Sequence, residues 1–311
     1  MKNITNILNK LRTWVKFSVF TFPLSALISC SQQEFEPAGS MKDAPITIAS
    51  AGVAELTTRA TINCDSLEGG SIGVYVNSIT GGSYTGDNIK WIYNNGYWDL
   101  DDETVVLFEN NGEKQQIAAY YPYAEPTAGK VQITLPEAYG DDYDNYDYLY
   151  GEYAQLNSNP ATITMKHLMA KVTVNLTTGT DIDAWDGVKS VELVDVPCMA
   201  DWTLPGATLS NHSTNADITL YGNGSTYCGY VLPNEAETLL LRITTESGRL
   251  FTATASLDNI DTINKTEVLS SGTHYTISVK VGKDKVTIEQ ISMGDFDSPF
   301  GDGWNDEEDL K

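Results

Sequence analysis

The chain has 311 residues, enough for two ordinary domains, and 41% of them are hydrophobic, so sizeable cores can form. It is strongly acidic, with 42 Asp and Glu against 19 Lys and Arg. A surface of this sign repels phosphate backbones, which excludes nucleic acid as an expected partner. Four cysteines are too few for a disulfide scaffold, although a Cys198–Cys228 pair stays open, and no Cys-x-x-Cys motif suggests zinc.

Residues 1–29 have the features of a lipoprotein signal peptide. A basic segment precedes an apolar run, Phe17 to Ile28, that is too short to span a bilayer. The run ends in Leu-Ile-Ser-Cys30, which resembles a bacterial lipobox whose cysteine thiol accepts the lipid. Each buried CH₂ of a palmitate-like chain contributes about 0.8 kcal/mol, so lipidated Cys30 would anchor the protein. Because Ser31 is not Asp, we expect the outer membrane, with residues 30–45 as a flexible tether.

Short apolar runs separated by Gly- and Asn-rich turns predict an N-terminal β domain over residues 46–164. The runs cover residues 46–48, 56–62, 71–76, 88–93, 104–108, 116–121 and 130–135. No amphipathic helix of convincing length interrupts them. The pattern is typical of an all-β sandwich.

The segment Met165 to Leu176, MKHLMAKVTVNL, is predicted to form one long strand near the middle of the chain. Its apolar residues change from odd to even positions at Leu168. Strand side chains alternate between faces, so this change indicates either a bulge or a strand that leaves one core and enters another. We place the boundary between two β domains here.

The second domain is expected over residues 165–311. Alternating runs at 239–244, 251–257 and 275–281 predict half-buried antiparallel strands. A turn then leads into a last strand, in which Val286 and Ile288 share a face but Ile291 and Met293 have the opposite parity. Beyond Met293 the chain is acidic and rich in turn residues.

One cluster of polar residues is a candidate site. Four aspartates alternate with four tyrosines: Asp141, Asp142, Asp144, Asp147, Tyr143, Tyr146, Tyr148 and Tyr150. Calcium binding, an aromatic contact surface for glycan or protein, and a solvated acidic loop all stay open, although the spacing does not fit an EF-hand. The three histidines lie in unrelated settings, and no nucleophile–base or paired-carboxylate arrangement stands out. We therefore predict neither an enzyme nor a cofactor or metal site.

Several segments, taken in chain order, resemble the fimbrillin family of type V pilins and Mfa-like surface lipoproteins. They are the lipobox at Cys30, TTRA at 57–60, SIGVY at 71–75, AAYYPY at 118–123, DYLYG at 147–151, HLMAKV at 167–172, GTHYTI at 272–277 and GDGW at 301–304. Together they extend over nearly the whole chain.

The resemblance implies two tandem transthyretin-like antiparallel β-sandwiches. It also implies export as a lipoprotein, cleavage between Arg59 and Ala60, and assembly by β-strand exchange with other fimbrial subunits. The strand removed would lie within residues 46–59, and the donor strand would be the last one, with side chains Val286, Ile288, Ile291 and Met293. A pilus subunit or fimbria-associated adhesin at the cell surface is therefore expected, in a stalk, tip, accessory or anchor position.

The alternative is a monomeric glycan-binding surface lipoprotein of a nutrient-uptake system. Four tryptophans are candidate sugar-stacking platforms: Trp91, Trp98, Trp185 and Trp202. Binding of host or bacterial surface glycan or protein fits this alternative and the adhesin equally.

Overall fold

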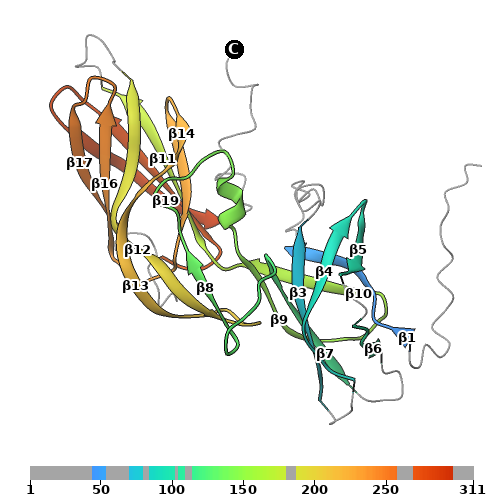
Figure 1. Ribbon diagram of the computed structural model, residues 1–311. Helices are drawn as coiled ribbons and strands as arrows, with labels where there is room; N and C mark the ends of the chain where they lie inside the picture. The colour runs from blue at the N-terminus through green and yellow to red at the C-terminus, as the bar shows by residue number, and fades with distance from the viewer. Residues whose placement is uncertain are drawn as a thin grey trace, which may run out of the picture. The chain divides into compact units, whose positions relative to one another are not determined.

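The structure is a computed structural model that describes residues 44–53, 70–79, 84–101, 104–108, 114–179, 187–257 and 269–296 (Figure 1). Strands account for nearly all of its regular structure, which confirms the all-β prediction. Within these ranges the only helical turn of note is a 3₁₀ turn, η2 (Tyr143–Tyr146), and no helix is long and apolar enough to cross a membrane.

The N-terminal half is built on a seven-stranded sheet in the order β2-β10-β9-β7-β3-β4-β5. All neighbours are antiparallel except β2 and β10, which are parallel. The strands are β2 (Ile48–Val53), β3 (Ser71–Ser78), β4 (Gly86–Asn94), β5 (Tyr97–Leu100), β7 (Gln115–Tyr121), β9 (Leu149–Gln155) and β10 (Ala161–His167). A two-stranded sheet of β1 (Ala44–Pro45) and β6 (Leu107–Phe108) lies beside them.

The two ends of this sheet, β2 and β5, lie close to each other, and the apolar side chains on one face of the sheet share one core. On the other face, Tyr75, Ala118, Tyr120 and Tyr150 belong to a second core. Alternation explains the burial: in β10, Ala161, Ile163 and Met165 are buried while the residues between them are exposed. Trp91 and Trp98 are also buried in this core.

The C-terminal half contains two five-stranded sheets that share a second core. One has the order β14-β15-β11-β18-β19, and the other is β13-β12-β16-β17 with β8 paired to β12 as its fifth strand. The strands are β8 (Lys130–Thr134), β11 (Ala170–Thr178), β12 (Val188–Thr203), β13 (Thr208–Thr219), β14 (Tyr221–Asn223), β15 (Thr226–Val231), β16 (Thr238–Thr245), β17 (Leu250–Ser256), β18 (Thr273–Val281) and β19 (Val286–Asp295).

The predicted long strand at 165–176 is two strands. β10 ends at His167 and β11 begins at Ala170, with Leu168 and Met169 between them. The side chain of Met165 lies in the first core, while Leu168, Met169 and Ala170 lie in the second. The change of parity thus marks the point where the chain passes from one core to the other.

Residues from both halves meet around Trp202, which is fully buried. Figure 1 shows β8 running beside β12, and the pairing joins Lys130 to Thr203 through Thr134 to Met199. The indole packs edge-on against Tyr120 at 5.4 Å and Tyr148 at 5.8 Å. Its Nε1 donates a 2.7 Å hydrogen bond to the Gly206 carbonyl.

Candidate functional site

Strand β2 is an edge strand whose apolar side chains lie in the first core. We call the site that residues 46–53 occupy beside β10 the groove. It pairs only with β10 in the described part of the sheet, and the pairing passes from Ile48–Ala161 to Ser50–Thr162. Ala49 is therefore an extra residue, a β-bulge that reverses the alternation, and its side chain is exposed. Ile46, Ile48 and Ala51 are buried, at 4%, 7% and 5% exposure.

Asn159 holds the segment that precedes β2 in place. Its Oδ1 accepts hydrogen bonds from the Thr47 backbone N–H at 2.8 Å and from Thr47 Oγ1 at 3.0 Å. Its Nδ2 donates to the Pro45 carbonyl at 2.8 Å. The Ala161 N–H donates to the Thr47 carbonyl at 2.7 Å. One amide side chain thus fixes where residues 45–47 enter the groove.

Strand β19, which carries the predicted donor residues, lies at the edge of a C-terminal sheet. It pairs antiparallel with β18 from Val281–Val286 to Thr273–Asp295. The register shifts between Val279–Ile288 and Ser278–Gln290, so Glu289 is an extra residue. The four predicted side chains, Val286, Ile288, Ile291 and Met293, are all partly buried against the second core. The change of parity seen in the sequence is thus a bulge, and each member of the set faces inward in this chain's own fold.

Phe296 fixes the chain directly after β19. Its ring is 6% exposed and stacks on His167 at 4.1 Å and 16° and on Tyr230 at 5.9 Å and 19°. His167 Nδ1 lies 2.9 and 2.8 Å from the two oxygens of Asp147, while its Nε2 is buried without a partner. Burial raises the pKa of the Asp147 carboxyl, and the hydrogen bond with His167 opposes that rise.

His274 occupies a second buried position, at the start of β18. Its Nε2 lies 2.8 Å from Thr173 Oγ1, and Lys171 is its neighbour on β11. Burial, followed by the charge of Lys171, lowers the pKa of His274 to about 4. The imidazole is therefore neutral near pH 7 and serves as a core hydrogen-bonding group.

The Asp and Tyr cluster does not converge on an ion. Asp147 faces His167, and Asp144 accepts a 3.4 Å hydrogen bond from the Tyr230 hydroxyl. Nowhere in the described ranges do three or more His, Cys, Asp or Glu side chains form a group that could hold a metal. Of the four tyrosines, Tyr150 lies within the second core, and Tyr143, Tyr146 and Tyr148 are partly buried against it.

The tryptophan platforms of the glycan-binding alternative are not exposed. Trp91, Trp98 and Trp202 are buried, at 5%, 6% and 0% exposure, because each lies on an inward position of its strand. Trp185 lies outside the described residues.

The two C-terminal cysteines, Cys198 and Cys228, are buried free thiols.

Three predicted positions, Cys30, Arg59 and Ala60, also lie outside the described residues.

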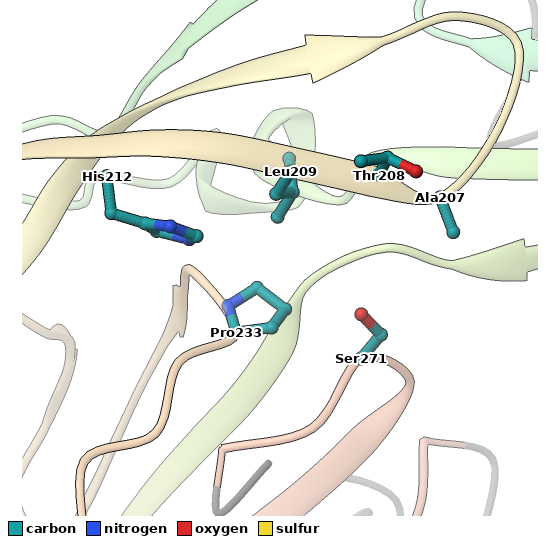
Figure 2. A pocket seen from close by; sticks show the side chains of 6 residues that line it. All are labelled: Ala207, Thr208, Leu209, His212, Pro233 and Ser271. Carbon is teal, nitrogen blue, oxygen red and sulfur yellow. The ribbon is translucent and has the colours of Figure 1, made fainter. Parts of the chain in front are cut away.

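The C-terminal half contains a pocket of about 320 Å³, lined by Ala207, Thr208, Leu209, His212, Pro233 and Ser271. Figure 2 shows these six side chains. Its lining offers two hydroxyl groups and an imidazole but no carboxylate or strongly basic side chain. It therefore indicates no particular ligand.

The family model described as Fimbrillin-like matches residues 58–295. The chain belongs to this family. The resemblance noted in the sequence is thereby confirmed.

Solved structures with a similar fold include two candidate cell adhesion proteins. That of Bacteroides uniformis has a TM-score of 0.64 and 17% identity, over 81% of this chain and 99% of its own. That of Bacteroides ovatus has a TM-score of 0.62 and 16% identity, over 81% and 98%. At this identity the likeness shows the fold alone. No protein with a curated description matches the sequence.

Proposed function

We propose that this fimbrillin-like protein is a fimbrial subunit or fimbria-associated adhesin that assembles by β-strand exchange after proteolysis at Arg59. Export as an outer-membrane lipoprotein through Cys30, and two tandem transthyretin-like sandwiches at 46–164 and 165–311, belong to the same proposal. In such an arrangement β8 of the first range is contributed to a sheet of the second, where it pairs with β12. The observation that carries it is the position of β2, an edge strand upstream of Arg59 that fills an apolar groove.

Removal of β2 would expose both apolar and polar surface. The edge of β10 would lose its backbone partner, and the sites of Ile46, Ile48 and Ala51 would open to water. Exposed strand edges with a hydrophobic face recruit another strand. A cut at Arg59 followed by release of β2 would therefore open a binding site beside β10.

The glycan-binding alternative gains nothing from the tryptophans, since the three described ones are buried. It predicts a monomer that stays monomeric after proteolysis. Strand exchange predicts higher species instead, so one experiment separates the two functions.

The test uses the chain from Ser31 onward and an Arg-specific endoprotease. Beyond Ser31 the sequence contains arginine only at positions 59, 242 and 249. Arg242 lies within β16 and is held by Glu192 at 2.8 Å and Asp217 at 2.6 Å, so we expect it to resist the protease. Arg249 is exposed in the turn after β16, so the new N-termini must be sequenced to separate a cut at Arg249 from a cut at Arg59.

The products are followed by N-terminal sequencing, by size-exclusion chromatography and on a gel without boiling. A fragment beginning at Ala60 together with heat-labile multimers supports the proposal. The Arg59→Ala variant is the matched control and should remain monomeric. Proteolysis that leaves only monomers, or multimers of equal amount in the Arg59→Ala variant, contradicts it.

A further inference from the structure

Strand β10 begins its ladder with β2 at Ala161. In a parallel ladder, a residue donates its N–H to the carbonyl just before the residue that it faces, and its own carbonyl accepts from the N–H just after that residue. Ala161 faces Ile48, and its N–H donates to the Thr47 carbonyl at 2.7 Å, as this pattern requires. One step back along the ladder, two residues earlier on each strand, Asn159 would face Ile46.

Asn159 makes the two hydrogen bonds of that position with its side chain. Its Nδ2 donates to the Pro45 carbonyl, just before Ile46, and its Oδ1 accepts from the Thr47 N–H, just after it, both at 2.8 Å. Because a primary amide carries a donor and an acceptor, it acts here as one more peptide group of β10. The Oδ1 atom also accepts from the Thr47 hydroxyl at 3.0 Å, so the contact recognises one side chain as well as the backbone.

The other edge of the same segment is also occupied. The Ile46 N–H donates to the Val106 carbonyl at 2.8 Å, and β1 pairs with β6. Residues 44–47 are thus held on both edges, whereas β2 pairs only with β10 in the described part of the sheet. All of these contacts lie upstream of Arg59, so cleavage there breaks none of them.

We propose that Asn159 is a positioning residue that retains the N-terminal strand in the groove after cleavage at Arg59, so that cleavage and opening of the groove are separate steps. This rests on the proposed function, because only a chain cut at Arg59 has a strand to release. The side chain of Thr47 is exposed, so apolar packing does not hold it and the hydrogen bonds to Asn159 do. The lifetime of the cut complex therefore depends on one amide as well as on the apolar fit.

The test measures release of the N-terminal fragment from the cut protein. The chain from Ser31 onward carries Arg249→Lys, so that the exposed turn after β16 is not cut. It is treated with an Arg-specific endoprotease, which is then inhibited, and the products are diluted to prevent rebinding. The amount of fragment 31–59 that stays bound is followed over time by size-exclusion chromatography and mass spectrometry.

Four variants isolate the contact. Asn159→Ala removes all three hydrogen bonds and should release the fragment at least about ten-fold faster. Ser158→Ala is the matched control, because it removes a hydrogen bond to the Pro160 carbonyl in the same turn and none to the fragment, so its rate should stay within about two-fold of wild type. Thr47→Val removes only the hydroxyl and should release about three-fold faster, while Thr47→Ser keeps the hydroxyl and should restore the wild-type rate.

The two sides of the contact are coupled, which separates retention from a general effect on the turn. In the Asn159→Ala chain, Thr47→Val should have no further effect, because its partner is already gone. Equal release by wild type and Asn159→Ala, or a Thr47→Val effect of the same size in both backgrounds, overturns the proposal. Thr47 lies outside the turn, so the Thr47→Val result stands even where Asn159→Ala disturbs the local fold.

A second measurement keeps this inference apart from the proposed function. If Arg59 is not cut in the folded chain, or if chains that have lost the fragment stay monomeric, the proposed function fails. The contact is then tested in the uncut chain through hydrogen exchange of the Ile46 amide, which bonds to Val106 and not to Asn159. Asn159→Ala should speed that exchange by about ten-fold, and equal exchange in the two chains overturns the role of Asn159.

Discussion

His274 makes the stability of this protein depend on pH in a way that one substitution can isolate. Its side chain is 2% exposed, and burial holds its pKa at about 4, against 6.5 for the ordinary group. The unfolded chain takes up the proton near pH 6.5, while the folded chain does so only near pH 4. Below pH 6.5 the unfolded state therefore binds more protons, so stability is fully present above 6.5 and is lost as the pH falls towards 4.

The size of the effect follows from the two pKa values. Between pH 7 and pH 5 this residue alone should remove about 2 kcal/mol from the free energy of unfolding, since each pKa unit corresponds to about 1.4 kcal/mol. The measurement is urea unfolding at intervals of half a pH unit. In His274→Gln the amide can keep a hydrogen bond to Thr173 but cannot take up a proton, so the profile should be flatter by that amount.

The control variant keeps the imidazole of His274 and removes its hydrogen-bond partner instead. Thr173→Val removes the hydroxyl that lies 2.8 Å from His274 Nε2, so it should lower stability at every pH and keep the steep dependence. Equal slopes in the wild type and in His274→Gln between pH 7 and pH 5 would refute the reasoning. That result would mean that the core admits the charged imidazole.

Four further substitutions, one of them a control, test the packing. Trp202→Phe should lower the free energy of unfolding by about 2 kcal/mol in urea titration, because it removes a buried hydrogen bond and part of a fully buried ring. Gly73→Ala should cost about 2 kcal/mol or more, since its new methyl group would collide with the ring of Tyr120; Gly52→Ala, with open space around the same methyl, should change stability by less than about 0.5 kcal/mol. Phe296→Ala should speed hydrogen exchange of the β19 amides by about ten-fold or more and leave β16 unchanged; equal exchange in both variants would show that the stacking does not hold the strand.

The elements that were predictable are those with a regular or continuous apolar run. The run at 275–281 corresponds to β18, whose apolar residues alternate. The runs at 71–76 and 116–121 correspond to β3 and β7, which are buried on both faces and therefore read as nearly continuous apolar segments. The run at 104–108 is strand only at Leu107–Phe108. The donor residues lie on one strand as predicted, and their change of parity proved to be a bulge.

The long β12–β13 hairpin was not predictable in the same way. Its register shifts twice, between Leu193 and Val196 and between Met199 and Asp201, so no single period of two extends along β12. β13 is polar and mostly exposed, and it lacks the apolar signal of a strand. Phe296 was missed for a related reason: it lies in an acidic, turn-rich tail and is buried only through rings contributed by His167 and Tyr230.

The covalent connection between β2 and the rest of the chain explains why proteolysis would have to come before assembly under the proposed function. A strand from a second copy would have to compete with residues 46–53 for the edge of β10. While residues 46–53 remain joined to β3, their effective concentration is on the order of millimolar, and a second copy at micromolar concentration is disfavoured by about 1,000-fold, or about 4 kcal/mol. After a cut at Arg59 the resident strand becomes a separate peptide that can diffuse away. The edge of β10 and the sites of Ile46, Ile48 and Ala51 would then be open to a strand from a second copy.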